Sequence, residues 1–475
     1  MRRISPPELS GLLGAWSAGT GTLPKRLARS IETAILNGRL PLGVRLPAER
    51  LLAQDLQVAR GTVAAAYDHL RATDLIITRA GSGSVTALPP RLRDRLAPWS
   101  TDFGEEGRRG AVLDLTIAEP TAPFAELHMA VRAAAENLHA ALLSEDRSGC
   151  GQKELREAIA ARYSSQGLPT RAEDILMTSG ADAALDLVSA VYLRHGHRVI
   201  VDSPTYPRAL STLRAAGARL IGQPLGPLGW DLETLERTLS TSHAALAYLV
   251  PDFHNPTGLL MSEEQRSKLR NRISQHDTLF IIDETMRDLD LRTAPQPPSH
   301  IASAAISRHV ITIGSLSKTL WPGLRVGWIR AHRQTVTELS RAAITSSLVP
   351  PVLDQLTAIQ LLEHFDDILA FRLNLLREQR NHLATLLSNL HWARSETPIG
   401  GLTFWLELLD TNSTRLANHA AAHDLRLSPG FQFSPDGVLD QYLRIPFTLT
   451  SEALDKVVER LINAHADLSP ATHSG

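Results

Sequence analysis

Apolar residues at helical spacing form the first clear pattern along the chain. They predict an amphipathic helix with a buried face of Leu23, Leu27, Ile31 and Ile35. Two further helices are expected over residues 48–54 and 60–71. Two apolar segments, 75–78 and 84–87, flank a Gly-Ser-Gly turn and predict a β-hairpin. Three helices followed by a hairpin indicate a winged helix-turn-helix domain, and a small helical bundle without a ligand is the alternative.

A different pattern begins at about residue 111, where short apolar segments alternate with helix-like segments. This alternation predicts a parallel sheet covered by helices on both faces. The expected strands are Ile175–Thr178, Arg198–Val201, Ala245–Val250, Thr278–Ile282, His309–Ile313 and Arg325–Ile329, with a further short strand near Leu220. Between the two patterns, residues 89–110 are rich in Pro, Gly and charge, which is typical of a linker. An ordered connector that packs on a domain is the alternative.

Charge divides the chain in the same place. Residues 1–100 carry 14 Lys and Arg against 7 Asp and Glu, whereas the remainder carries 35 against 43. A basic segment joined to an acidic one is typical of a polyanion-binding module attached to another domain. Chance clustering of solvated charges explains the charge difference equally well when it is considered alone.

Cysteine content and hydropathy bear on the compartment. The single cysteine, Cys150, excludes an internal disulfide framework and favours a reducing environment. No segment approaches the roughly 18 consecutive apolar residues of a membrane span. No apolar segment of signal-peptide length follows the N-terminal arginines. We therefore expect a cytoplasmic protein.

Four polar clusters follow predicted strands, at the sheet edge where α/β proteins bind ligands. A small-residue turn at 178–182 can present amides to an anion, and Asn255 can donate to a phenolate oxygen. Asp283 can pair with a heterocyclic nitrogen cation. Lys318 offers an amine for a Schiff base, and Arg325 offers a phosphate partner. Each cluster alone has an ordinary alternative: a β–α turn, a loop, a helix cap or metal ligand, and solvated basic residues.

The N-terminal segment ILNGRLPLGVRLPAERLLAQDLQVARGTVAAAYDHLRATDLIITRAGSG strongly resembles the DNA-binding domain of the GntR family. The resemblance extends from Leu23 to Ala87. It implies that the third helix lies in the major groove of double-stranded DNA. Ala59 replaces a frequent Ser or Thr cap, and Ala64 replaces a frequent Arg, so base recognition would depend more on Arg60. The implied DNA contacts are Arg45, Arg50, Arg60, Thr62 and Gly81.

The order of SGA, NPTG, DE and SxSK…R, over about residues 111–466, resembles fold-type I aminotransferases. Joined to the GntR-like segment, it resembles the MocR/GabR regulators. The expected fold is multi-domain: an N-terminal winged helix-turn-helix, and an α/β aminotransferase-like domain with a mostly parallel seven-stranded sheet and a small C-terminal α+β domain. The expected boundaries are 1–88 for the DNA-binding domain, 89–110 for the linker, about 145–335 for the large domain, about 345–466 for the small domain and 467–475 for a tail.

The same resemblance implies pyridoxal 5'-phosphate (PLP) as cofactor and gives its contacts. Lys318 would form the Schiff base, Asp283 would pair with the ring nitrogen, and Asn255 would bond the ring hydroxyl. Tyr206 would stack on the ring, although a core aromatic is the alternative. The phosphate contacts would be Gly180, Ala181, Ser315 and Arg325. Arg444 would bind an effector carboxylate, or else would form an ion pair within the small domain. No metal site is predicted.

Two residues depart from the aminotransferase pattern. Thr285 replaces a frequent Tyr, and Asp182 replaces a frequent Gln, where an acid near a phosphate is unfavourable unless it points away. Both changes weaken the case for fast transamination.

The sequence leaves three functions open. The leading one is a DNA-binding regulator, with at most weak transaminase activity, that senses PLP or an amino compound. The alternatives are an active aminotransferase with an accessory DNA-binding domain, and a DNA-binding protein whose C-terminal domain only dimerises. The resemblance also implies a homodimer in which each DNA-binding domain can lie on the partner.

Overall fold

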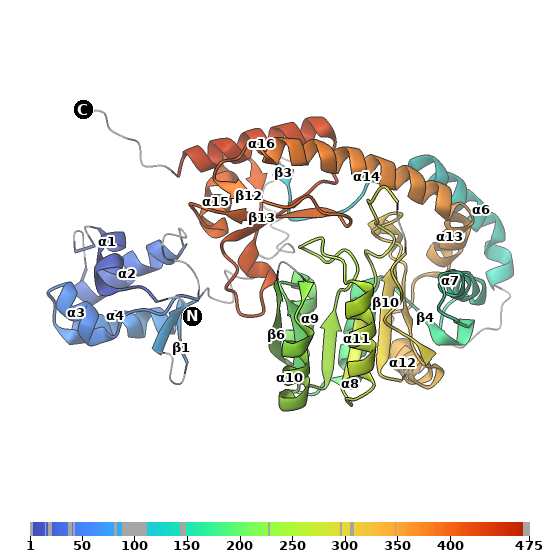
Figure 1. The fold of residues 1–475 in the computed structure, drawn as a ribbon, viewed down its shortest axis with the longest axis horizontal. Coiled ribbons are helices and arrows are strands. Elements are labelled where there is room, and N and C mark those ends of the chain that lie inside the picture. Colours follow the sequence, from blue (N-terminus) through green and yellow to red (C-terminus); the bar gives the residue numbers. More distant parts are fainter. Residues whose placement is uncertain are drawn as a thin grey trace.

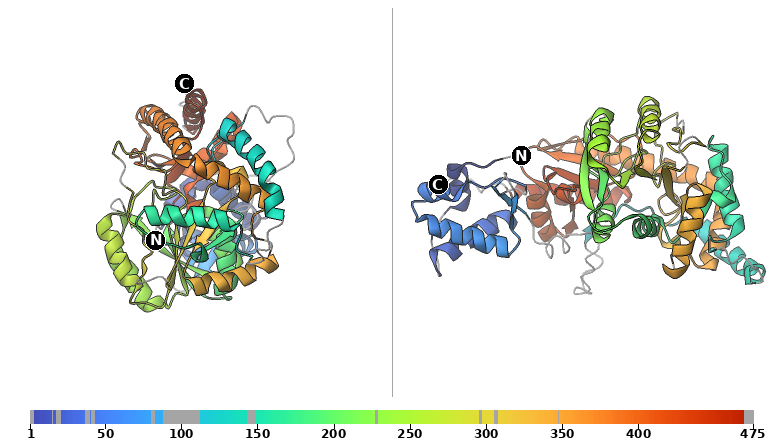
Figure 2. Two further views of the ribbon diagram at one scale, coloured as in Figure 1. Left: turned by 90° about the vertical axis from the view of Figure 1, so that its right-hand side faces the viewer. Right: turned by 90° about the horizontal axis from the view of Figure 1, so that it is seen from below.

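A computed structural model describes most of the chain (Figure 1). We call the N-terminal DNA-binding-like unit, residues 3–87, the head, and the remainder from residue 112 the body. The head lies at one end of the molecule, beside the C-terminal strands of the body (Figures 1 and 2). The predicted linker, 89–110, and most of the predicted tail lie outside the described residues. The described residues are 3–14, 16–17, 21–36, 40, 43–79, 83–87, 112–142, 149–226, 229–294, 297–304, 308–346 and 348–468.

The head contains the predicted winged helix-turn-helix and one additional helix. Leu27, Ile31 and Ile35 are fully buried, which confirms the predicted apolar face, whereas Leu23 is 40% exposed at the start of its helix. The additional helix, α1, is fixed by Ser5, whose side chain caps the first turn reciprocally with Glu8. The elements are α1 (Pro6–Leu13), α2 (Leu23–Leu36), α3 (Glu49–Asp55), α4 (Arg60–Ala72), β1 (Ile76–Arg79) and β2 (Gly83–Thr86), the last two being antiparallel.

The body is built on a sheet with the strand order β4-β11-β10-β9-β8-β5-β6-β7. The predicted seven-stranded sheet is confirmed, and the two-residue β7 extends it. Only β11 and β7 run antiparallel to their neighbours. The strands are β4 (Ile175–Thr178), β5 (Arg198–Ser203), β6 (Arg219–Gly226), β7 (Gly229–Trp230), β8 (Leu246–Leu249), β9 (Leu279–Asp283), β10 (Val310–Ser315) and β11 (Gly327–Arg330).

The last predicted strand of the sheet begins two residues later than expected. The prediction placed a strand over Arg325–Ile329, but β11 begins at Gly327. Arg325 has a positive φ of 53° and follows a 3-10 turn, Pro322–Leu324, so it cannot continue the extended strand. Its side chain is thereby directed into the region above the strand ends, where it lines a cavity.

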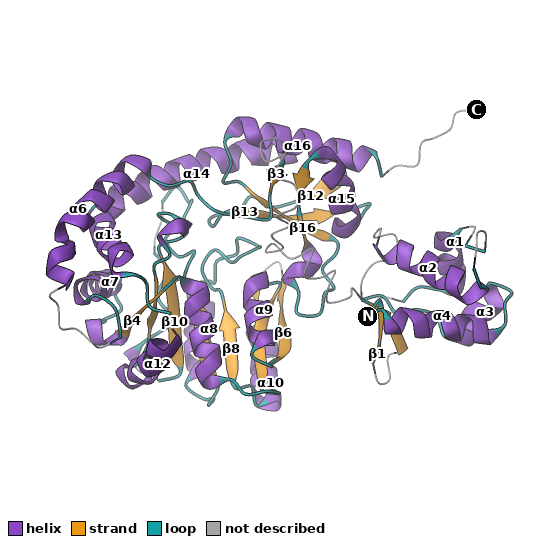
Figure 3. Cartoon of the chain, turned by 180° about the vertical axis from the view of Figure 1, so that it is seen from behind, coloured by secondary structure: helices purple, strands orange, loops and turns teal. Residues whose placement is uncertain are grey.

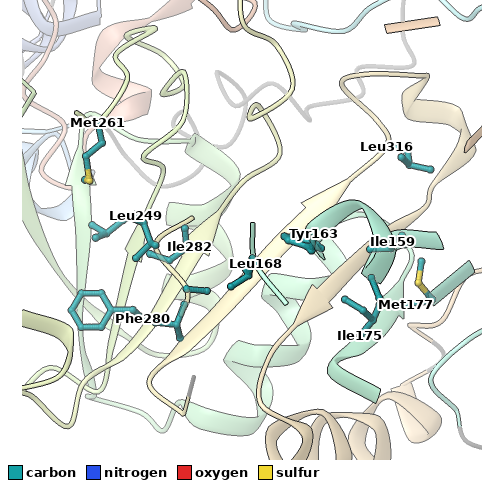
Figure 4. Close-up of a cluster of buried hydrophobic side chains, with 14 of the residues drawn as sticks. Ile159, Tyr163, Leu168, Ile175, Met177, Leu249, Met261, Phe280, Ile282 and Leu316 are labelled. Atoms are coloured by element: carbon teal, nitrogen blue, oxygen red, sulfur yellow. The ribbon is translucent and has the colours of Figure 1, made fainter. Parts of the chain in front are cut away.

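Alternate side chains of the strands enter two hydrophobic layers. Figure 3 shows the strands of this sheet and the helices that lie beside them. Figure 4 shows part of one layer, in which Ile175 and Met177 of β4 join Phe280 and Ile282 of β9. This layer also takes in α7 (Lys153–Ser165), α10 (Leu232–Ser242), α11 (Glu263–Ile273) and α13 (Val352–Glu363). The opposite layer takes in α8 (Ala181–Tyr192), α9 (Pro207–Ala215) and α12 (Arg333–Ser346).

A third hydrophobic cluster forms the small C-terminal domain, over a sheet with the order β12-β13-β16-β15. The first strand of the body, β3, also belongs to this domain, because it pairs with β14 through Leu113 and Leu425. The elements are β3 (Leu113–Asp114), α14 (Phe365–Leu387), β12 (Ala393–Arg394), β13 (Thr403–Leu408), α15 (Ser413–Ala420), β14 (Leu425–Arg426), β15 (Ser428–Pro429), β16 (Tyr442–Pro446) and α16 (Ser451–Ala466). Helix α6 (Phe124–Leu142) packs instead against α13 and joins the first hydrophobic layer through Ala130.

One body side chain belongs to the hydrophobic cluster of the head. Phe431, from the 3-10 turn Gly430–Phe433, is only 4% exposed and packs with the buried residues of the head. Val438 lies near Gly43, where a Cβ on the glycine would stand 2.9 Å from the valine Cγ1. The segment 430–438 therefore contacts the head.

Among the described helices, none has the length and apolar character needed to cross a membrane.

Candidate functional site

A cavity of about 470 Å³ lies at the carboxyl ends of the central strands, between the large sheet and the small domain. Segments far apart in the sequence meet there, because parallel strands end at the same edge of the sheet. The predicted cofactor and effector residues that line it are Gly180, Ala181, Tyr206, Asn255, Asp283, Lys318, Arg325 and Arg444.

The start of α8 forms one end of the cavity. Gly180 caps this helix with a φ of +98°, and a Cβ on Gly180 would lie 3.9 Å from the guanidinium carbon of Arg325. The Gly180 amide donates to the Thr178 carbonyl at 2.7 Å, so Gly180 supplies space for an anion and not a free donor. The amides of the first turn of α8, from Ala181 on, have no acceptor within the helix. Together with Arg325 they form a cradle for an anion.

The predicted phosphate contact Ser315 does not line the cavity. Its side chain is buried, and its hydroxyl donates to the Val326 carbonyl at 3.2 Å and lies 3.0 Å from the Ser317 hydroxyl. Ser317, which the sequence analysis did not select, lines the cavity instead. Both serines precede Lys318 in one turn, and the alternation after a strand end does not reveal which hydroxyl turns inward.

Asp283, the last residue of β9, lies buried at the base of the cavity. Its carboxylate accepts from the Tyr248 hydroxyl at 2.6 Å and from the Thr285 amide at 2.9 Å. Burial raises the pKa of the Asp283 carboxyl, and the hydrogen bonds from Thr285 and Tyr248 oppose that rise. A cation beside Asp283 would therefore find a carboxylate already held by two donors.

Tyr248 is a site residue that the sequence analysis missed. It lies within the apolar strand β8, in register with Ile281 of β9, two residues before Asp283. A hydroxyl on one apolar strand near an acid on the next was the available signal. It requires the strand order, however, which the sequence alone did not reveal.

Two further side chains line the cavity, and one of them has unused polar capacity. The Oδ1 atom of Asn255 is buried and has no hydrogen-bond partner among the described residues. Tyr206 caps the start of α9 and lines the cavity wall. A ligand ring with a polar substituent would give Asn255 the partner that the protein does not provide.

Lys318 reaches the cavity from the turn after β10. Its Nζ donates to the Ala118 carbonyl at 3.1 Å and lies 4.0 Å from the Glu119 carboxylate. Burial lowers the pKa of the Lys318 amine, and Glu119 opposes that shift. A lowered pKa favours the neutral amine, which is the form that attacks a carbonyl carbon.

Arg444, on β16, lies across the cavity from the strand ends. It is 4% exposed, its Nη2 donates to the Thr116 carbonyl and to Ser428 Oγ, and its guanidinium lies 5.1 Å from the centre of the Phe433 ring. Burial lowers its pKa to about 10, so the guanidinium keeps its charge at neutral pH. No carboxylate within the described ranges lies at ion-pair distance from Arg444, which favours the effector role over an ion pair within the small domain.

The predicted DNA contacts gather on the head. Arg60 is the first residue of α4, and its side chain is 72% exposed and 3.3 Å from Glu49. Arg45 bridges to Val85 and packs against Gly83 of β2, beside the wing. Arg50 is exposed on α3, and Thr62 is half-buried in the first turn of α4. The last predicted contact, Gly81, lies outside the described residues.

Known proteins resemble both parts of the chain. Residues 112–461 match the model for aminotransferase class I and II, and residues 23–85 match bacterial regulatory proteins of the gntR family. An uncharacterized HTH-type transcriptional regulator of Bacillus subtilis, YdfD, is 30% identical over 92% of this chain and 96% of its own. The probable rhizopine catabolism regulatory protein MocR of Rhizobium meliloti is 30% identical over 70% of each chain.

A solved structure matches the body. It is the α-aminoadipate aminotransferase LysN of Thermus thermophilus, complexed with N-(5'-phosphopyridoxyl)-L-leucine. It is 29% identical, with a TM-score of 0.67, and the match covers 76% of this chain and 93% of LysN.

Proposed function

Because this chain belongs to the aminotransferase class I and II family and carries a gntR-family DNA-binding domain, as MocR-type transcription regulators do, we propose that its cavity senses PLP or an amino compound and thereby changes DNA binding by the head. DNA is its macromolecular partner and PLP its cofactor. We also assign it to the cytoplasm, where its DNA and cofactor are found.

The cavity fits PLP at three points. The cradle of Ala181 and Arg325 suits a phosphate, and buried Asp283 suits a protonated ring nitrogen. The Oδ1 atom of Asn255, which has no partner among the described residues, can accept a hydrogen bond from the ring hydroxyl. When bound, PLP supplies an aldehyde that condenses with amines. Asp283 would keep the ring nitrogen protonated, and Lys318 would hold the cofactor in place through its amine.

The sensing role is supported above all by the surroundings of Arg444. Its guanidinium is buried in the cavity that holds Lys318, and it pairs with no described carboxylate. A fixed, partly desolvated guanidinium binds a carboxylate in two parallel hydrogen bonds. A molecule with both an amine and a carboxylate would therefore engage Lys318's cofactor and Arg444 together, which points to an amino acid or a related amino compound as effector.

The segment 430–438 supports a connection from the cavity to the head. The Phe433 ring lies beside the Arg444 guanidinium. The backbone carbonyl of Phe433 accepts a hydrogen bond of 2.8 Å from the amide of Thr205, which directly precedes Tyr206. Two residues earlier, Phe431 enters the hydrophobic cluster of the head. A ligand that favours one position of this segment would shift the head by the difference in its affinity for the two positions.

The coupling predicts the behaviour of Phe431→Ala. We expect PLP binding and effector-free DNA binding to stay within about twofold of wild type. The change in DNA affinity caused by the effector should be largely lost, because the head no longer packs on this side chain. Coupled sites typically change affinity by about 5- to 150-fold, so the loss is measurable by fluorescence anisotropy on labelled operator DNA. Leu409→Ala, which removes an apolar side chain 53% exposed on the small domain, is the control. A full effector response in Phe431→Ala would contradict this route.

We further propose a homodimer. Phe124 on α6 and Phe371 on α14 are 82% and 70% exposed, and a partner subunit would cover this apolar surface. Two heads would then read two half-sites of an operator. Light scattering of wild type against Phe124→Asp tests this assembly.

A working aminotransferase is the second candidate, because Lys318, Asp283 and Arg444 are all present in one cavity. It predicts steady conversion of an amino donor and a keto acid at a useful rate.

The deciding experiment measures the affinity of the protein for DNA upstream of its own gene, at fixed salt with competitor DNA. Cofactor-free protein, PLP-bound protein and PLP-bound protein with single amino acids are compared, and Arg444→Met serves as the matched variant. A specific affinity that changes with PLP, or with an amino acid only when Arg444 is present, supports sensing. Specific binding that is unaffected by every addition would contradict it, and turnover without specific DNA binding would favour the enzyme.

A further inference from the structure

Asp182 places a negative charge beside the phosphate cradle. It is the second residue of α8, it lines the cavity, and its side chain is only 19% exposed. The N-terminus of a helix attracts anions, but a carboxylate in that same turn would repel a phosphate bound there. A compensating charge is therefore needed if the cradle is to hold the cofactor.

Arg208 supplies the compensating charge from a different helix. It is the second residue of α9, and its Nε lies 3.0 Å from Asp182 Oδ2. A weaker approach, 4.0 Å, joins Arg208 Nη2 to Asp186 one turn further along α8. The ion pair thus connects the first turns of α8 and α9, and α9 begins directly after the ring-facing Tyr206.

The charge of Asp182 reaches the cofactor contacts. Burial raises the pKa of Asp182, and Arg208, Lys318 and Arg325 oppose that rise, in this order of strength. Asp182 in turn favours the protonated form of Lys318. Asp182 is therefore within electrostatic range of both the cradle arginine and the cofactor lysine, and Arg208 is its strongest neutralising partner.

We propose that Arg208 is a positioning residue of the cofactor site, which neutralises Asp182 and holds its carboxylate away from the PLP phosphate. Arg208 also lines the cavity, but its influence on the cofactor passes through its ion pair with Asp182. Where related proteins often have a neutral side chain at position 182, this chain has a carboxylate whose charge Arg208 cancels. A variant that lacks only Arg208 therefore leaves an uncompensated negative charge in the cradle. The inference rests on PLP as the cofactor and is independent of effector sensing.

A double-mutant cycle tests the proposal by PLP affinity, measured from the absorbance of the bound cofactor and from quenching of protein fluorescence. Arg208→Ala should weaken PLP binding by at least about tenfold, because it removes one partner of a mostly buried ion pair. Asp182→Asn should bind PLP at least as well as wild type. The double variant Asp182→Asn/Arg208→Ala should recover to within about threefold of wild type, which a loss of folding would not allow.

Arg219→Ala is the matched control, because Arg219 is an exposed arginine at the start of β6, at the end of the sheet away from the cavity. It should bind PLP like wild type, and thermal unfolding of the cofactor-free variants should stay close to one another. A double variant as weak as Arg208→Ala would overturn the proposal, since Arg208 would then contact the phosphate directly or serve the fold. Unchanged affinity in Arg208→Ala would overturn it equally. Failure of wild type itself to bind PLP would instead remove the cofactor assignment.

Discussion

Lys318→Ala is expected to abolish the visible absorption of lysine-bound PLP while leaving basal DNA binding intact. The Lys318 amine is the one that faces the cavity, 3.1 Å from the Ala118 carbonyl, and burial lowers its pKa towards the reactive neutral form. Alanine removes the nucleophile, so the covalent bond cannot form. The helices of the head pack in one hydrophobic cluster, which the body joins through Phe431, so α4 should keep its position in the variant. An absorption spectrum and an anisotropy titration on operator DNA measure both outcomes.

Few other lysines could replace Lys318 as the attachment site of PLP. The sequence contains only four other lysines: Lys25, Lys153, Lys268 and Lys456. Lys153→Ala is a matched control, because this side chain is 65% exposed on α7, where it pairs with Glu157. The control should retain the visible band. A band that survives in Lys318→Ala would move the attachment to another lysine, and loss of basal DNA binding would show that cofactor attachment holds the head in its binding form.

Local sequence patterns predicted most helices and strands, and they missed short elements that have no clear periodicity. The helices of the head followed from apolar spacing, since Val63, Tyr67 and Leu70 form one buried stripe on α4. Helix α1 was missed because it is one short cap-dependent element, and a two-residue strand such as β7 gives no periodicity. The late start of β11 has a similar cause, because the conformation of Arg325 depends on the turn before it.

The site divides along the same line. Lys318, Asp283 and Asn255 were predicted because each lies in a short motif after a strand. Tyr248 and Arg208 were not predicted, because their partners are distant in the sequence. Tyr248 bonds Asp283, 35 residues further along the chain, and Arg208 pairs with Asp182, 26 residues before it on a neighbouring helix. Asp182 was recognised as unfavourable beside a phosphate, but its neutralising partner required the packing of α8 against α9. Charge compensation is a property of the fold, so the sequence revealed the problem and not its solution.

Arg60→Ala is expected to lower operator affinity by about 5- to 150-fold and to leave PLP binding unchanged. An arginine that pairs with a guanine through two hydrogen bonds contributes about 1–3 kcal/mol of discrimination. Arg60 is the exposed first residue of α4, and with alanine at position 64 few other side chains on that helix can read a base. Its ion pair with Glu49 is exposed, so releasing it to DNA costs little.

The comparison with Arg29→Ala separates base recognition from general attraction. Arg29 is exposed on α2, carries the same charge and lies outside the predicted DNA contacts. Arg29→Ala should bind operator and unrelated DNA with nearly unchanged affinity. Arg60→Ala should lose operator affinity much more than affinity for unrelated DNA, because sequence-independent binding depends on phosphate contacts that respond to salt. If both variants lose affinity for operator and unrelated DNA to the same extent, α4 does not read bases through Arg60. Recognition then has to be sought in the β1–β2 hairpin and in Arg45, which lies beside it.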